Sequence, residues 1–165
     1  MNSARFFTPF LLFAGLTWPA SAKNVWIDTD VSIGSPIRET DDAFALILAF
    51  HSPEIRIAGV STSYGNASLA YVDLVARDLA WRFGDSAHLS ASDVRAGARS
   101  TRDLGHRSAA SDAIAAASNR RRLTYVALGP LTNLATATQL HPRPRPRIDQ
   151  VIIDGRVDDG EDRRV

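Results

Sequence analysis

The chain has 165 residues, of which 45% are hydrophobic, and its formal net charge is +1. This composition is typical of one globular domain, it excludes a disordered chain, and it gives no indication of a nucleic-acid or membrane-surface partner. Because the chain contains no cysteine, disulfides, thiolate metal sites and cysteine nucleophiles are excluded as well.

The N-terminus has the parts of a secretory signal peptide. Arg5 precedes the apolar run FFTPFLLFAGLTW, and small residues lead up to Ala22. The run is short for a membrane span and contains Pro9, which disfavours a permanent transmembrane helix. We therefore predict a signal peptide over residues 1–22, cleaved after Ala22. The mature domain, residues 23–165, is expected in the periplasm or outside the cell, free of the membrane.

Strand and helix patterns alternate in the first half of the mature chain. An apolar run that begins at Asn24 and ends at Ile27 predicts a strand. Thr40 stands before DDAFALILAF, as an N-cap residue does before acids and a helix-length apolar segment. This segment is apolar almost all round, which predicts a helix that is buried on more than one side and ends before Pro53. The run EIRIAGVST predicts a second strand, and SYGNAS predicts a turn.

The same alternation continues in the second half. Ser68, a possible cap, precedes LAYVDLVARDLAWRF, whose apolar residues recur at helical spacing as far as Gly84. The following segment carries few signals apart from a short strand near Val94. After it, SAASDAIAAASN predicts a helix, and LTYVALG predicts a buried strand that ends at Gly129. PLTNLATATQL predicts a helix with Pro130 near its start, and IDQVIID predicts a last strand.

These elements predict an α/β fold, a Rossmann-like open sheet that is mostly parallel and carries helices on both faces. In such sheets, ligands bind outside the carboxyl ends of the strands. Asp28 and Asp30 follow the first strand, residues 61–66 the second, residues 129–133 a later one, and Asp154 the last. Polar groups from separate loops should therefore gather at one edge.

Four carboxylates stand at the first strand-to-helix junction. Asp41 and Asp42 in a helix's first turn also favour the helix dipole, so a purely structural role stays open for this pair. Asp28 and Asp30 leave the strand at alternate positions, and both side chains should tend to one face. Four acids so close repel one another unless a cation joins them, and oxygen ligands in an irregular cluster favour Ca²⁺. The residues therefore predict a candidate divalent-cation site.

Four motifs in this order carry a resemblance to a known family. They are VWIDTD, TDDAFAL, GVSTSYGN and LTYVALGPLTNLA, and with their flanks they extend from about Val25 to Ile153. In order and separation they resemble the inosine-uridine preferring nucleoside hydrolase family. The resemblance implies Ca²⁺-dependent hydrolysis of the N-glycosidic bond of ribonucleosides, which yields free base and ribose. It implies a small-molecule ribonucleoside substrate and no nucleic-acid partner.

The resemblance also implies roles for particular residues. Asp30 holds the position of the acid that binds Ca²⁺ and acts as general base on a water. Asp42 holds the position of a further calcium ligand, and Thr132 that of a ligand through its backbone carbonyl.

The remaining family positions concern the sugar. Asp41 and Asn66 match the residues that contact the ribose hydroxyls, and Asp28 matches a supporting acid. None of the four histidines occupies a family position, so the resemblance identifies no general acid for the leaving base.

Two departures from the family pattern bear on these expectations. The loop between the DxD and DD motifs is longer than usual, although extra loop residues cost little closure entropy. Family members are about twice as long, and their C-terminal half supplies a further calcium-binding Asp. We therefore expect an apparently truncated fold, whose exposed sheet edge would favour a homo-oligomer. Two alternatives stay open: a non-catalytic remnant that at most binds Ca²⁺ or ribosides, and an unrelated periplasmic α/β binding protein.

Overall fold

A computed structural model describes residues 22–34, 40–142 and 146–154 of the chain. The predicted signal peptide lies outside these residues, except for Ala22, and so do residues 155–165. Within the described ranges, no helix has the length and apolar character needed to cross a membrane.

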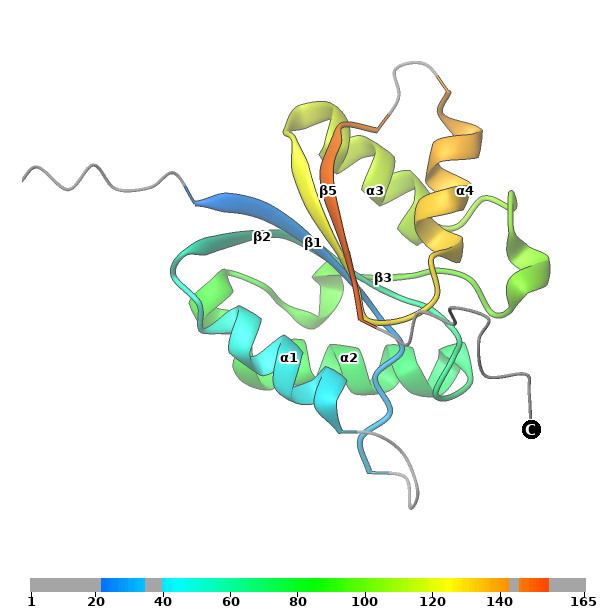
Figure 1. Ribbon diagram of the computed structural model, residues 1–165. Coiled ribbons are helices and arrows are strands. Elements are labelled where there is room, and N and C mark those ends of the chain that lie inside the picture. Colours follow the sequence, from blue (N-terminus) through cyan, green and yellow to red (C-terminus); the bar gives the residue numbers. More distant parts are fainter. Residues whose placement is uncertain (1–21, 35–39, 143–145, 155–165) are drawn as a thin grey trace, which may run out of the picture.

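Five parallel strands form one sheet in the order β3–β2–β1–β4–β5 (Figure 1). The strands are β1 (Lys23–Thr29), β2 (Ile55–Thr62), β3 (Val94–Ala96), β4 (Leu123–Ala127) and β5 (Ile148–Ile153). Central β1 places Asp28 opposite Ser61 of β2 on one side and opposite Ala127 of β4 on the other. The order along the sheet reverses between β1 and β4, which is where ligands bind in doubly wound folds. The prediction of an open parallel sheet is confirmed.

Helices cover both faces of the sheet, as predicted. Helices α1 (Asp41–Phe50) and α2 (Leu69–Phe83) lie on one side, and α3 (Ala109–Arg120) and α4 (Thr132–Leu140) on the other (Figure 1). Short 3₁₀ turns lie between the helices at Gly84–Ala87, Ala91–Asp93 and Thr101–Asp103.

The two predicted capping residues hold the expected positions without the expected bonds. Thr40 and Ser68 directly precede α1 and α2, yet neither side chain accepts a hydrogen bond from its helix. In α1, the Asp41 carboxylate instead accepts the N–H of Asp42 at 3.1 Å.

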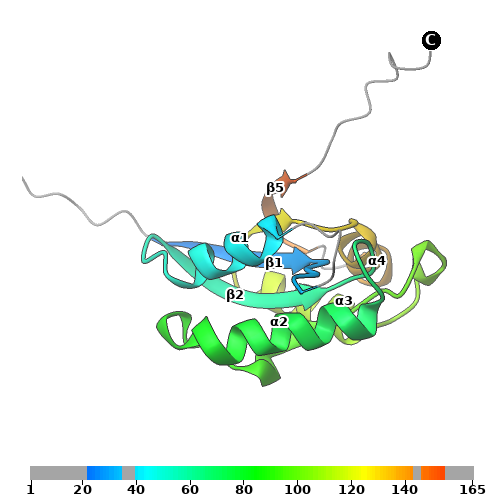
Figure 2. The same ribbon diagram turned by 90° about the horizontal axis from the view of Figure 1, so that it is seen from below.

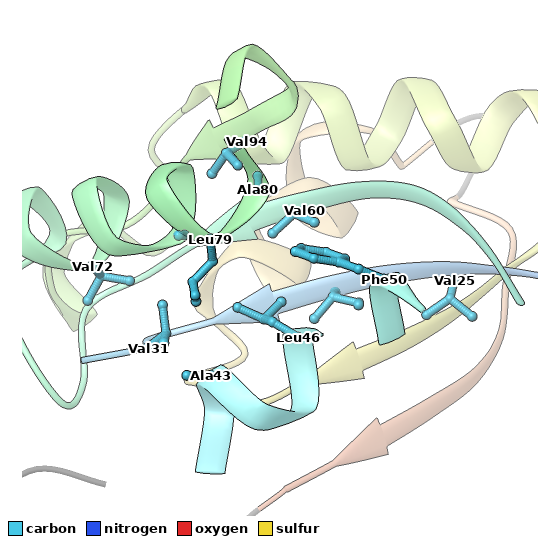
Figure 3. Close-up of a cluster of buried hydrophobic side chains, with 12 residues drawn as sticks. Val25, Val31, Ala43, Leu46, Phe50, Val60, Val72, Leu79, Ala80 and Val94 are labelled. Atoms are coloured by element: carbon cyan, nitrogen blue, oxygen red, sulfur yellow. The ribbon is translucent and has the colours of Figure 1, made fainter. Parts of the chain in front are cut away.

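The alternation of side chains along β1 divides the interior into two apolar clusters. Val25 and Ile27 face α1 and α2, where they meet Leu46, Phe50 and Leu79 (Figure 3). The other cluster packs against α3 and α4 and consists of Trp26, Ile114, Leu123, Tyr125, Ala127 and Ala137. Burial on both faces explains why the strands read as apolar runs rather than as an alternating pattern.

The prediction that α1 is buried on more than one side is wrong. Leu46 and Phe50 are buried, but Phe44 is 67% exposed and Leu48 is 71% exposed. The described residues cover only one side of this helix, so its other apolar side faces solvent. Strand β5, at the outer margin of the sheet (Figure 2), likewise exposes Ile153 to 58%.

Candidate active site

Asp30 directly follows β1 and lies under the loop that follows β2. Its side chain is 6% exposed, and its Oδ2 accepts the backbone N–H of Asn66 at 2.9 Å. Its Oδ1 is buried and has no hydrogen-bond partner among the described residues. Oδ1 of Asp30 is therefore shielded from water and free to bind a ligand.

Two glycines let separate loops approach this carboxylate. Gly65 has φ +150°, and a Cβ built on it would lie 1.8 Å from Oδ2 of Asp30. Gly129, in the loop after β4, would place a Cβ 3.1 Å from the Cβ of Asp30. The GN and GP pairs of the sequence motifs thus have a steric reason to contain glycine.

Asp42 is the second buried acid of the site. Its side chain is 4% exposed, and its Oδ2 accepts the hydroxyl of Thr29 at 2.8 Å. The pKa of Asp42 is raised to about 7, chiefly by burial and in part by the neighbouring carboxylates of Asp30 and Asp41. Burial also raises the pKa of Asp30, with Asp41 adding to the effect. The two buried acids therefore resist being charged together in the absence of a cation.

Three carboxylates converge at the N-terminus of α1. Oxygens of Asp41, Asp42 and Asp154 all lie within 4.8 Å of one another, a spacing that fits a single bound cation. None of these acids, nor Asp30, forms an ion pair with a basic side chain in the described part of the chain. An all-oxygen donor set with uncompensated negative charge suits a hard divalent ion.

Asp28 is placed differently from the other acids. It is fully buried, and it accepts hydrogen bonds from Ser61 Oγ at 2.6 Å, Tyr125 Oη at 2.7 Å and Asn133 Nδ2 at 2.9 Å. Burial raises its pKa in spite of these three donors, which lower it. The carboxylate ties β1, β2, β4 and α4 together, and its supporting role stays a prediction.

The structure also locates the two remaining predicted site residues. Asn66 contacts Asp30 through its backbone, and its side chain is half-buried at the same loop. Thr132 is the buried first residue of α4, with its hydroxyl 3.2 Å from that of Tyr64. The loops that carry Asn66 and Thr132 therefore meet beside Asp30, as the motifs predict, while the ligand and sugar roles of these residues stay predictions.

Sequence reasoning assigned no specific role to three residues that build this site. Tyr125 and Asn133 are polar residues within apolar segments, and that contrast was the available signal for the buried network around Asp28. Asp154 was expected among the polar groups at this edge, without a named partner, and the structure places it beside Asp41 and Asp42.

Comparisons with known proteins identify the family of the chain. The sequence matches the family described as inosine-uridine preferring nucleoside hydrolase over residues 25–157, so the chain belongs to this family. Among curated proteins it is similar to the uncharacterized protein C17G8.02 of Schizosaccharomyces pombe. The two are 30% identical over 155 residues, which cover 80% of this chain and 45% of that protein.

Solved structures show the same relationship. A plant nucleoside hydrolase, the PpNRh1 enzyme, superposes with a TM-score of 0.63 at 31% identity, covering 79% of this chain and 47% of that one. A purine-preferring ribonucleoside hydrolase from Gardnerella vaginalis shares the fold, with a TM-score of 0.60 at 21% identity over 82% of this chain and 49% of that one. The chain thus spans about half the length of the relatives that it matches.

Proposed function

We propose that the protein hydrolyses the N-glycosidic bond of ribonucleosides to free base and ribose, with Ca²⁺ as its cofactor. The observation that carries the proposal is the buried, unpartnered Oδ1 of Asp30 beside the acids of α1. Family membership supports the reaction class, and the oxygen-only donor set supports a hard cation.

The residues that would hold Ca²⁺ are Asp30, Asp42 and the backbone carbonyl of Thr132. When bound, the ion supplies positive charge that orients the ribose hydroxyls and favours deprotonation of water. The buried carboxylates gain most from that charge, because they are held with little compensation from the protein.

The chain's own residues supply the proton transfer and the positioning. Asp30 accepts the proton of the attacking water on Oδ1, while its Oδ2 stays fixed by the N–H of Asn66. Asp41 and the Asn66 side chain hold the ribose hydroxyls. Nearby carboxylates stabilise the positive charge that develops on the sugar as the glycosidic bond breaks.

A second candidate function is binding of Ca²⁺ or ribosides without turnover. The described residues contain the acid cluster of Asp41, Asp42 and Asp154. The chain spans 45–49% of the length of its relatives, so hydrolysis by the whole protein is a proposal for this chain. Binding of ribose or inosine in calorimetry, with no release of base, would favour this alternative.

The test compares Asp30→Asn with Asp149→Asn in the purified chain. Asp149 is an exposed acid on β5 that pairs with Arg122 and lies outside the site, so it serves as the matched control. With inosine or uridine, Asp30→Asn should lower ribose release at least about 100-fold, and the control should not. EDTA should abolish release, and excess CaCl₂ should restore it. Equal activity of the two variants would remove the mechanism.

We further propose export of the mature domain to the periplasm or the exterior after cleavage at Ala22. The support is the apolar, weakly basic N-terminal segment of the sequence. Mass spectrometry of the protein recovered from a periplasmic fraction should give a chain that begins at Lys23. Recovery of the chain only with Met1 still attached would contradict this.

A further inference from the structure

The end of β5 is held at the acid cluster by the sheet itself. The backbone N–H of Asp154 donates to the carbonyl of Ala127, the last residue of β4, at 2.8 Å. The preceding residue, Ile153, is in register with Ala127. Asp154 is therefore fixed by strand pairing at the edge where ligands bind in parallel sheets.

The Asp154 side chain has no described protein partner at this position. Its carboxylate takes part in no hydrogen bond or ion pair with the described residues, although oxygens of Asp41 and Asp42 lie within 4.8 Å of it. An exposed side chain at the end of a strand can turn toward solvent at little cost. The Asp154 carboxylate nevertheless lies beside those of Asp41 and Asp42. Like charges at this distance repel unless a cation lies between them.

A separate observation indicates a ligand at the same place. Asp30 is more than nine-tenths buried, with an unpartnered Oδ1, and it interacts directly with Asp42, a member of the cluster. A buried carboxylate oxygen without a donor is rare in native proteins unless an ion or water completes it. The two observations concern residues that directly follow two different strands, and both involve Asp42, which lies beside Asp30 and beside Asp154.

We propose that Asp154 is an additional carboxylate ligand of the divalent-cation site, so that the outermost strand contributes to the centre formed by β1 and α1. The inference rests on the proposed function and extends its ligand set of Asp30, Asp42 and Thr132. A further carboxylate supplies an oxygen and a negative charge to an ion that takes six to eight oxygen ligands.

The test measures calcium binding by isothermal titration calorimetry for the wild type, Asp154→Asn, Asp42→Asn and the control Asp149→Asn. Asp154→Asn should weaken Ca²⁺ binding by about 10-fold or more, whereas Asp149→Asn should leave it unchanged. Asp154→Glu, which keeps the carboxylate, should recover part of the affinity. In EDTA, the Tm of Asp154→Asn should equal or exceed that of the wild type, because a repelling charge has been removed.

The outcomes separate this inference from the proposed function. Wild-type affinity in Asp154→Asn, together with loss of binding in Asp42→Asn, would overturn the role of Asp154 alone. A lower Tm of Asp154→Asn in EDTA, without a change in affinity, would also overturn it by indicating a structural role. Calcium binding that depends on Asp154 but brings no ribose release would uphold the role and overturn the proposed activity. A wild-type chain that binds no divalent cation would overturn both.

Discussion

Asp42 connects the stability of the protein to pH. In the cation-free chain its pKa is raised from 3.8 to about 7. Burial is the main cause, and the neighbouring Asp30 carboxylate is a smaller one. Between these two pH values the folded state holds a proton that the unfolded chain has released. The free energy of unfolding should therefore fall as the pH rises from about 4 to 7, and it should level off above pH 7.

This prediction can be checked by thermal unfolding in EDTA at pH 5 and at pH 8. The Tm should be several degrees lower at pH 8, and excess CaCl₂ should reduce the difference, because a bound cation favours the charged carboxylates. Asp42→Asn should show a weaker dependence. The pKa values of Asp28 and Asp30 are also raised, so they act in the same direction. A wild-type Tm in EDTA that increases between pH 5 and pH 8 would contradict the prediction.

Gly65 should tolerate no side chain. Gly65→Ala places a Cβ 1.8 Å from Asp30 Oδ2 and requires alanine to adopt φ +150°. The substitution should therefore displace Asp30 and lower the free energy of unfolding by about 3 kcal/mol or more. Gly105→Ala is the control: its φ is +79°, but its Cβ would meet only Gln139 Oε1, at 3.0 Å. It should cost about 1 kcal/mol. Denaturant unfolding and calcium titration check both variants, and equal effects would show that the approach to Asp30 is unimportant.

The site was predictable from sequence to the extent that its residues belong to short motifs. Asp30, Asp42 and Asn66 come from such motifs, and the structure brings them together. Asp154 and Asn133 belong to the same site only because distant segments meet in the sheet. The strand ends predicted that residues 129–133 and Asp154 would lie at this edge, but no local pattern specified which side chains would meet there.

At the scale of elements, the side chain of Asn133 connects α4 to three other segments of the fold. From the first turn of α4 its Nδ2 donates to Asp28 at 2.9 Å and to the Thr62 carbonyl at 3.1 Å. Its Oδ1 accepts the N–H of Ala98 at 2.9 Å. One buried amide thus fixes α4 against β1, β2 and the loop after β3.

Asn133→Ala should therefore lower the free energy of unfolding by about 2–4 kcal/mol, because it leaves buried donors and acceptors without partners. Asn119→Ala, at an exposed position near the end of α3, is the matched control and should change little. Chemical denaturation of both variants measures the difference. A loss below about 0.5 kcal/mol in Asn133→Ala would show that water replaces the amide.

The strands and helices themselves were largely predictable, because each carries its own pattern. DDAFALILAF and LAYVDLVARDLAWRF coincide with α1 and α2 residue for residue. The exposed side of α1 could not be predicted, since apolar residues all round a helix normally indicate burial all round it. Which side is covered depends on how much of the fold surrounds the helix, and this is a property of the whole molecule.

On the scale of the whole molecule, the described residues leave an apolar groove open between α1 and β5. It has a volume of about 230 Å³, and Ala45, Ala49, Val126, Leu128 and Ile152 contribute to its lining. Phe44 and Leu48 extend the apolar surface along the outer side of α1. Surfaces of this kind promote association in water.

We expect the purified chain to self-associate through this groove, and Ile152→Lys to reduce the association. Leu74→Lys removes a residue of α2 that is 66% exposed and does not line the groove, so it controls for charge and for lost apolar surface. Size-exclusion chromatography with light scattering, over a range of concentrations, gives the mass of each variant. A monomeric wild type, or equal effects of the two substitutions, would contradict the prediction.

The pairing of β1 with β4 has a consequence for how the molecule forms. Residues 25–28 align with residues 124–127, so the middle of the sheet closes only after most of the polypeptide is available. Contacts between such distant segments make folding slow, because the entropy of closing a long loop is lost before the contact is gained. Asp41 and Asp42, in the first turn of α1, therefore stay solvated during folding until β4 and β5 have paired with the rest of the sheet.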